Sequence, residues 1–218
     1  MGKIVLVGAD PELFWKNERG FVSVIGKLGG TKNLALPIDD EGNGVLEDNV
    51  AAEFNIPPAS TVNDFIKSIN KNLTFLEKKA GEYGATIATD ASASFPEEEM
   101  QDPMAWIFGC EPDKNAWTGK YNPKPKSKDV FLRSCGGHVH IGHGDSVDAP
   151  TVIKCMDIML GVPSTQLDND ARRRELYGKP GAYRDKPYGS EYRTLSNFWI
   201  FSDELKAWVF ERTQMAIS

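Results

Sequence analysis

The sequence of 218 residues has no long hydrophobic run. No apolar stretch approaches the roughly 20 residues that a helix needs to cross a bilayer. The apolar residues 4–7 are few and lead directly into Asp10 and Glu12. This pattern is typical of a first β-strand rather than of a secretory signal peptide, so we expect a cytoplasmic protein without a membrane partner.

Cysteine and positive charge are also in short supply. The three cysteines, Cys110, Cys135 and Cys155, form no close pair, so they fit neither a disulfide framework nor a zinc ribbon. The formal net charge is −6, whereas a general nucleic-acid binder normally carries a surplus of basic residues. The composition therefore gives no direct evidence for nucleic acid as a partner.

The usual nucleotide-binding loops are missing as well. The sequence contains neither a Walker A motif nor a glycine-rich fingerprint at a strand–helix turn. The segment GKLGGTK at residues 26–32 has too few residues between its glycines and lacks a following helix. Any nucleotide site must therefore be built on a sheet.

The chain shows no internal repeat, no low-complexity tract and no linker, and we predict one domain over residues 1–218. Short apolar or alternating patterns predict strands at residues 3–7, 21–25, 51–56, 130–141 and 190–195. Residues 85–95 are β-like, and the stretch 96–129, rich in Pro, Asp and Asn, is expected to be mostly loop.

Caps and apolar stripes predict three helices. The first follows Ser60 or Thr61 and ends near residue 81. The second opens at Pro150 and is expected to stop at residues 161–163, and the last is capped by Ser202. Because the strands do not alternate regularly with helices, we predict a mainly antiparallel α+β fold rather than a doubly wound parallel sheet.

Ionisable residues recur two positions apart on the predicted strands, where side chains share a face. The pairs are His138 with His140, Glu191 with Arg193, and Glu53 with Asn55, while Glu12 follows the first strand beside Asp10. Buried carboxylates are costly without a counter-charge. A sheet lined with these groups therefore needs cations, and oxygen ligands with an imidazole suit Mg²⁺ or Mn²⁺ better than zinc.

Positive side chains are expected around the same surface, namely Lys27, Lys32, Arg173, Arg184 and Arg193. Metals held by carboxylates, together with Arg and Lys clamps, are what phosphoryl transfer from a nucleotide requires.

Several motifs in this order resemble the phage-type carboxylate–amine ligases, or amidoligases of type 2, of the glutamine synthetase and γ-glutamylcysteine ligase superfamily. The motifs are Ala9 to Glu12, GGTK at 29–32, EFNIPP at 53–58, GGHVHIG at 136–142, YGKPGAYR at 177–184 and GSEYRTLSNFW at 189–199. The pair GGHVHIG and Gly-x-Glu-Tyr-Arg is the most specific part. If the chain is phage-encoded, its compartment is the host cytoplasm.

The resemblance implies a glutamine synthetase-like catalytic domain, in which a curved, mainly antiparallel sheet holds divalent metals and ATP on its concave face and carries helices on its outer face. The implied metal ligands are Glu12, Glu53, His138 and Glu191. The same resemblance places Arg193 near the transferred phosphate, Arg184 near ATP or the carboxylate substrate, and Glu191 among the catalytic groups. Further candidates for ATP or metal contacts are Lys32, Asp48, Asn55, His140 and Arg173.

The implied reaction joins a small-molecule or peptide carboxylate to an amine. The carboxylate attacks the γ-phosphate of ATP, and the amine then displaces phosphate from the acyl phosphate. Asp10 or Glu47 is a candidate to take the proton of the amine. An oligomer is compatible with this interpretation.

Two other interpretations stay open at this point. The first is a metal-dependent hydrolase that uses His138, His140 and His143, although His143 follows Gly142 and is expected to face solvent. The second is an inactive ligase fold that serves as a binding protein. Tight zinc or iron without a nucleotide requirement would favour the hydrolase, and ATP binding without turnover would favour the binding protein.

Overall fold

A computed structural model describes residues 5–107, 112–144 and 147–218. Residues 3 and 4 of the first predicted strand and Cys110 lie outside these ranges. None of the helices in the described ranges is long and apolar enough to span a membrane.

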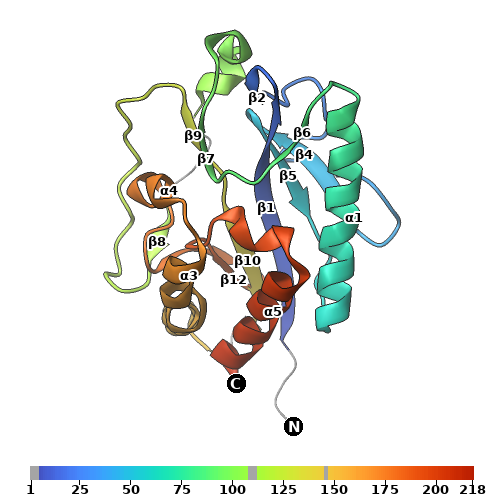
Figure 1. The fold of residues 1–218 in the computed structure, drawn as a ribbon. Helices are drawn as coiled ribbons and strands as arrows, with labels where there is room; N and C mark the ends of the chain where they lie inside the picture. The colour runs from blue at the N-terminus through green and yellow to red at the C-terminus, as the bar shows by residue number, and fades with distance from the viewer. Residues whose placement is uncertain (1–4, 108–111, 145–146) are drawn as a thin grey trace.

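Ten strands of the described residues form one sheet (Figure 1). Its main path runs β3-β4-β5-β1-β10-β12-β11-β8, and β2 and β6 pair with the far end of β1. The bounds along the path are Leu36–Pro37, Gly44–Asp48, Ala51–Asn55, Leu6–Asn17, Gly137–Gly142, Gly189–Tyr192, Ala182–Lys186 and Lys114–Asn115, with β2 at Gly20–Val22 and β6 at Thr86–Ala88. Strands β7 (Ser92–Ser94) and β9 (Leu132–Ser134) form a separate pair.

Every pairing between these strands is antiparallel. The predicted mainly antiparallel α+β class is therefore confirmed. The long central strand β1 is paired on both sides, with β10 and with β5, so it is the axis on which the rest of the sheet is assembled.

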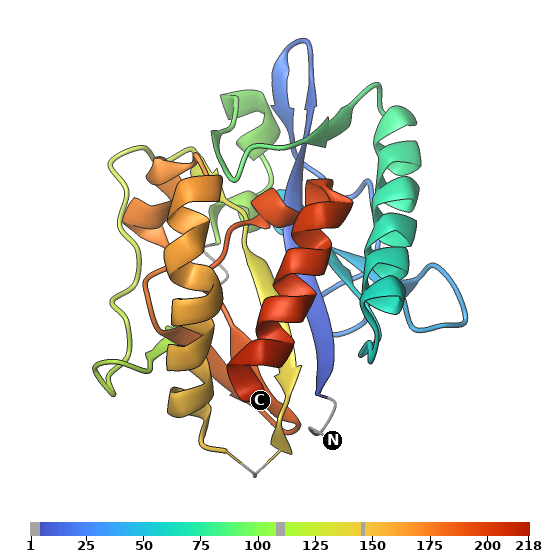
Figure 2. The same cartoon turned by 60° about the horizontal axis from the view of Figure 1, so that its bottom comes forward.

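The helices cover one face of the sheet. Figure 2 shows α1 (Val62–Gly81), α5 (Asp203–Ile217) and the helix formed by α2 (Ala149–Met156) and α3 (Val162–Leu167) side by side over that face. Their apolar residues pack on alternate residues of β1 and β10, among them Val7, Leu13, Val139 and Ile141, all fully buried. Because side chains alternate across a strand, the intervening residues of β1 face away from these helices.

Two of the predicted helix starts are confirmed. Thr61 caps α1 by accepting a hydrogen bond from the Asp64 backbone N–H at 3.1 Å, and Ser202 caps α5. Within the core, Phe65 of α1 stacks on Trp199 with ring centroids 5.8 Å apart. Residue 199 belongs to a short 3₁₀ helix, Asn197–Phe201, which joins the sheet to α5.

The predicted stop of the second helix at residues 161–163 is wrong. The helix continues from α2 through a π-helical turn, Asp157–Gly161, into α3. Pro163 is the second residue of α3 and directly follows the π-helical turn. Gly161 is required by packing, because a Cβ atom there would lie 2.6 Å from the Tyr192 hydroxyl.

The stretch 96–129 is mostly loop in its described residues, as predicted. It contains two short 3₁₀ helices, Glu97–Met100 and Pro103–Trp106, and the two-residue strand β8. The Arg-rich segment after Leu167 forms a short helix, α4 (Ala171–Leu176), which the sequence pattern did not indicate.

Candidate active site

The central strand carries the acidic residues within its length. We expected Glu12 to follow the first strand, but β1 extends to Asn17, so Asp10 and Glu12 are strand residues. They lie on the face opposite to the helices, since Ala9 and Leu13 belong to the helix-covered core. The antiparallel register places Asp10 beside His138 on β10 and Glu12 beside Glu53 on β5.

The first cluster of ionisable side chains consists of Glu12, Asp48 and Glu53, which we call the carboxylate group. Each residue offers a carboxylate oxygen, and these oxygens all lie within 4.8 Å of one another. Glu12 is 9% exposed, and one of its oxygens accepts a hydrogen bond from the Gly136 backbone N–H at 2.8 Å. The Lys32 ammonium lies 2.7 Å from Asp48, where it contacts the cluster.

Burial raises the pKa of Glu12, and the neighbouring charge of Asp48 adds to this effect. Burial also raises the pKa of Glu53 well above its ordinary value, with further contributions from Asp10, Glu12 and Asp48. Three carboxylates this close repel one another in their charged form. A divalent cation with oxygen ligands relieves that repulsion, so the donor set fits Mg²⁺ or Mn²⁺.

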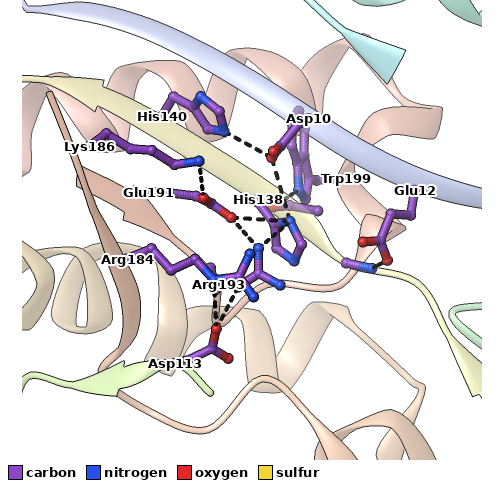
Figure 3. A network of polar contacts seen from close by, with 12 residues as sticks. Asp10, Glu12, Asp113, His138, His140, Arg184, Lys186, Glu191, Arg193 and Trp199 are labelled. Carbon is purple, nitrogen blue, oxygen red and sulfur yellow. Dashed lines mark hydrogen bonds and ion pairs between the residues drawn. The ribbon is translucent and has the colours of Figure 1, made fainter. Parts of the chain in front are cut away.

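The second cluster consists of Asp10, His140 and Glu191, which we call the histidine group. Figure 3 shows it beside Arg193 and Lys186. The Asp10 Oδ1 atom lies 3.0 Å from His140 Nε2. Glu191 is 1% exposed, and its Oε2 atom lies 2.7 Å from the Lys186 ammonium, while its other oxygen contacts Arg193.

The carboxylates of the histidine group differ electrostatically from those of the carboxylate group. Burial by itself would raise the pKa of Asp10, but the charges and hydrogen bonds of His140 and His138 hold it far below its usual value. Burial and Asp10 oppose ionisation of Glu191, yet Arg193, His138 and Lys186 lower its pKa to about 2. Both carboxylates are thus stabilised in their charged form by the chain itself.

His138 lies between the two clusters. Its Nδ1 atom is 3.5 Å from Asp10 and 3.7 Å from Glu191, and Arg193 donates a hydrogen bond to it at 3.1 Å. The glycine directly before β10 makes room for the ring, because a Cβ atom at Gly136 would lie 2.0 Å from His138 Nε2.

The arginines lie at one end of the two groups. Arg193 is 6% exposed and reaches Asp113 at 2.8 Å as well as Glu191 and His138. Arg184 lies 3.5 Å from the same oxygen of Asp113. Asp113, from the loop directly before β8, therefore joins the two arginines.

Arg173 approaches from α4, whose N-terminus is capped by Asp170. Its side chain is 2% exposed and donates hydrogen bonds to the carbonyl oxygens of Cys135 and Thr194, at 2.6 and 3.1 Å. Burial lowers its pKa. The residue lines a cavity of about 60 Å³ together with Glu12 and Arg193, at the end of the face where β1 continues to Phe14.

A larger cavity of about 310 Å³ lies at the opposite end of the face. Its walls are mostly apolar, with Leu6, Ile56 and Pro58, and it reaches His140 and Tyr188. The Tyr188 hydroxyl lies 2.7 Å from His140 Nδ1, and the two rings stack 5.9 Å apart. The ionisable groups therefore occupy the middle of a surface that has a polar end and an apolar end.

The predicted metal ligands are brought together, but in two sets. Glu12 and Glu53 belong to the carboxylate group, Glu191 to the histidine group, and His138 lies between them. Asp48 and His140, which were further candidates, belong directly to the two groups. Asn55 is half-buried two residues after Glu53 on β5.

Three sequence-based expectations about this surface are wrong. Lys27 contacts the Ser23 carbonyl and Glu99 instead of the acidic residues of the two clusters. Glu47 is not available as a base, because its carboxylate accepts hydrogen bonds from three backbone N–H groups of the loop at residues 26–29. His143 is buried rather than solvent-facing, and its ring contacts Ser190 Oγ and the Gly144 carbonyl.

Asp113, Lys186 and Tyr188 were not predicted from the sequence. Asp113 lies in a long loop and has no periodic pattern to reveal it. Lys186 ends β11, and Tyr188 lies in the tight turn between β11 and β12. Lys186 contacts Glu191 and Tyr188 contacts His140, and only the hairpin brings these residues together.

Residues 127–218 match the family model described as phage phiEco32-like COOH.NH2 ligase-type 2. The match covers less than half of the chain, and it makes this segment similar to the phage-type carboxylate–amine ligases. The matched segment contains β10 and β12, which carry His140 and Glu191 of the histidine group, and also His138 and Arg193. No curated protein matches the chain.

The match confirms the predicted resemblance for the C-terminal segment and supports an enzyme that joins a carboxylate to an amine. For residues 1–126 the resemblance stays a prediction. The geometry nevertheless links the two parts of the chain, because β1 supplies Asp10 to the histidine group and pairs with β10 over six residue pairs.

Proposed function

We propose that the chain is an ATP- and divalent-cation-dependent carboxylate–amine ligase that forms an amide through an acyl phosphate. One observation carries the proposal. Buried carboxylates, histidines and Arg193 gather on the face of the sheet that the large helices leave uncovered. This combination suits the binding and activation of a triphosphate better than it suits a purely structural role.

A glutamine synthetase-like catalytic domain is part of the proposal. Its support is the antiparallel sheet with helices on one face and ionisable groups on the other. The proposed domain spans residues 1–218, because β1 near the N-terminus and β10 and β12 near the C-terminus contribute to the same cluster.

The proposed holders of the cation are Glu12, Asp48 and Glu53, with the histidine group beside them. A bound Mg²⁺ or Mn²⁺ would neutralise phosphate charge and orient the triphosphate. The fit rests on the three clustered oxygens and on the raised pKa values of Glu12 and Glu53. Such carboxylates would be stabilised in their charged form by a nearby cation.

The proposed reaction has two steps. An oxygen of the substrate carboxylate attacks the γ-phosphorus of ATP and ADP departs, leaving an acyl phosphate. The nitrogen of the amine then attacks the acyl carbon, phosphate departs, and the amine loses a proton. Arg193 is proposed to stabilise charge on the transferred phosphoryl group, since it is already held by Glu191, His138 and Asp113.

Arg184 and Lys32 are proposed to contact ATP or the carboxylate substrate at the rim. Arg184 is 30% and Lys32 47% exposed at the side chain, so both can reach a ligand from the edge of the site. Arg173 is proposed to face the same ligand from the side of the site on which Arg193 lies. Its hydrogen bonds to backbone carbonyl groups fix its orientation. Asn55 and His140 complete the proposed contacts, and the substrates are small molecules or peptides.

A metallohydrolase with three histidine ligands has less support. The ring nitrogens of His143 contact Ser190 and Gly144, whereas His140 lies with Asp10 and Glu191. An inactive ligase-fold binding protein is distinguished from the active ligase only by turnover.

Trapping of the acyl phosphate tests the proposal directly. The protein is incubated with ATP, Mg²⁺, hydroxylamine and pools of amino acids, small carboxylic acids and short peptides. The expected result is hydroxamate and ADP in equal amounts with at least one pool. ATP hydrolysis without hydroxamate would contradict the acyl phosphate, and binding of ATP without any ADP would favour the inactive binding protein.

A further inference from the structure

A cavity on the helix side of β12 takes no part in the proposed reaction. It encloses about 360 Å³, which is within the range of small-molecule sites, and lies between the helix that runs from α2 to α3, Trp117 and residues 178–180. Tyr192 belongs to the core beneath the helices, whereas its chain neighbours Glu191 and Arg193 contact each other in the candidate active site. The cavity and the candidate active site therefore lie on opposite sides of this segment.

Asp157 places a buried negative charge on the wall of the cavity. The residue is 4% exposed. Its carboxylate accepts hydrogen bonds from the Tyr192 hydroxyl at 2.7 Å and from the Trp117 indole N–H at 2.5 Å, and the Thr194 hydroxyl lies 3.3 Å away. These three partners are neutral, so they orient the carboxylate without compensating its charge.

The cationic side chains on the same wall are engaged elsewhere. Arg174 lies 3.3 Å from the Asp168 carboxylate and donates to the carbonyl oxygens of Ser164 and Asp168. Lys179 donates to the carbonyl oxygens of Arg174 and Glu175, at the end of α4. Among the charged residues that line the cavity within the described ranges, Asp157 is thus the one held by neutral groups. A buried charge of this kind favours a cationic ligand.

The rest of the wall is suited to an apolar body. Trp117, Ile158 and Val162 line the cavity, and each of them is more than half exposed. The Lys154 ammonium lies 5.6 Å from the centroid of the Trp117 ring, so this indole already attracts a cation. A carboxylate beside an indole and aliphatic side chains is the combination that recognises an ammonium ion with an apolar body.

We propose that this cavity is a second ligand site, separate from the proposed ligase site, and that it binds a small organic ammonium ion with an aliphatic or aromatic body. The ammonium pairs with Asp157, and the body packs on Trp117, Ile158 and Val162. The site is built on the π-helical turn Asp157–Gly161, a distortion that recurs at functional sites. The proposal does not depend on the ligase reaction.

Titration of the full chain with phenethylammonium tests the proposal. Calorimetry measures the affinity, and the NMR signal of the Trp117 indole N–H, assigned with Trp117→Phe, locates the site. The expected result is saturable binding that shifts this signal. The neutral phenethyl alcohol and the anionic hydrocinnamate have similar bodies and should bind at least tenfold more weakly, because neither pairs with Asp157.

Three variants separate the charge of Asp157 from the shape of the cavity. Asp157→Asn keeps the size of the side chain and should weaken phenethylammonium binding at least tenfold. Ile158→Lys places an ammonium on the exposed part of the wall and should weaken it equally, so it supplies the comparison if Asp157→Asn does not fold. Leu167→Lys makes the same change at an exposed residue of α3 outside the wall, and it should bind like the wild type. Melting curves establish that each variant is folded.

Three outcomes overturn the proposal. The first is a wild-type protein that shows no saturable phenethylammonium binding, or binding that leaves the Trp117 signal in place. The second is equal affinity for the ammonium and the alcohol. The third is unchanged affinity in folded Asp157→Asn or in Ile158→Lys relative to Leu167→Lys.

Discussion

Glu53 combines burial with three like charges in its surroundings, those of Asp10, Glu12 and Asp48. Its ionised carboxylate therefore destabilises the metal-free protein at neutral pH. Glu53→Gln keeps the size of the side chain and removes the charge. We predict that the melting temperature of the metal-free protein rises by about 2–4 °C if the relief amounts to about 1 kcal/mol.

The same substitution should abolish most of the stabilisation by Mg²⁺, because it removes a ligand of the carboxylate group. Differential scanning calorimetry with and without Mg²⁺ measures both effects. A variant that melts below the wild type without metal would show that Glu53 is held by interactions that its charge strengthens, contrary to this account.

The pH dependence of metal stabilisation follows from the raised pKa values of Glu12 and Glu53. In the pH range between their ordinary and folded values the folded state holds more protons than the unfolded state, so stability falls as pH rises. A divalent cation binds the ionised carboxylates and offsets that loss.

We therefore predict that saturating Mg²⁺ raises the melting temperature more at about pH 8 than at about pH 5, where protons compete for the same carboxylates. Glu191 does not contribute to this difference, since its pKa is lowered to about 2 and it stays ionised throughout the range. An equal thermal shift at both pH values would contradict the assignment of the metal to Glu12 and Glu53.

At the scale of elements, the π-helical turn Asp157–Gly161 connects the covering helix to the strand that carries the site. Asp157 accepts hydrogen bonds from Tyr192 at 2.7 Å and from the Trp117 indole at 2.5 Å. Tyr192 lies between Glu191 and Arg193 on the chain. The turn therefore holds the side of this segment that faces away from the site.

Gly161→Ala should disturb this connection, because the added Cβ atom would lie 2.6 Å from the Tyr192 hydroxyl and 3.0 Å from an Asp157 oxygen. We predict a loss of about 1–3 kcal/mol in the free energy of unfolding, as for other overpacked interiors. Denaturant unfolding measures the loss.

Gly81→Ala, at the end of α1, is the control. A Cβ atom there meets nothing within 4 Å, and Ala is the better helix former. This variant should be as stable as the wild type or slightly more stable. Equal stability of both variants would show that the packing around Gly161 yields easily.

The elements that have a strong local pattern in their own residues could be predicted from the sequence. The cap at Thr61, the apolar stripe of α1 and the alternation around His138 each depend on neighbouring residues. The continuation of a helix past Gly161 and Pro163 could not, because it depends on Tyr192, some thirty residues away along the chain. The length of β1 was underestimated because Asp10 and Glu12, which belong to the site, interrupt its apolar pattern.

At the scale of the whole molecule, the site depends on contacts between distant parts of the chain. Glu12 and Glu53 were singled out from the sequence separately, yet only the register of β1 with β5 makes them neighbours. Asp113 and Lys186 reach the site through a loop and a hairpin turn, for which a single sequence offers no local pattern.

The central claim is that these groups form a site for ATP and a divalent cation. Calorimetric titration with ATP, with and without Mg²⁺, on the wild type, Glu191→Gln and Lys114→Met tests it most directly. Glu191→Gln removes the charge that Lys186 and Arg193 share, while Lys114→Met changes the exposed ion pair of Lys114 with Asp185. The account predicts Mg²⁺-dependent ATP binding that Glu191→Gln weakens at least tenfold and Lys114→Met leaves intact. No ATP binding by the folded wild-type protein with Mg²⁺, or equal affinity in all three proteins, would contradict it.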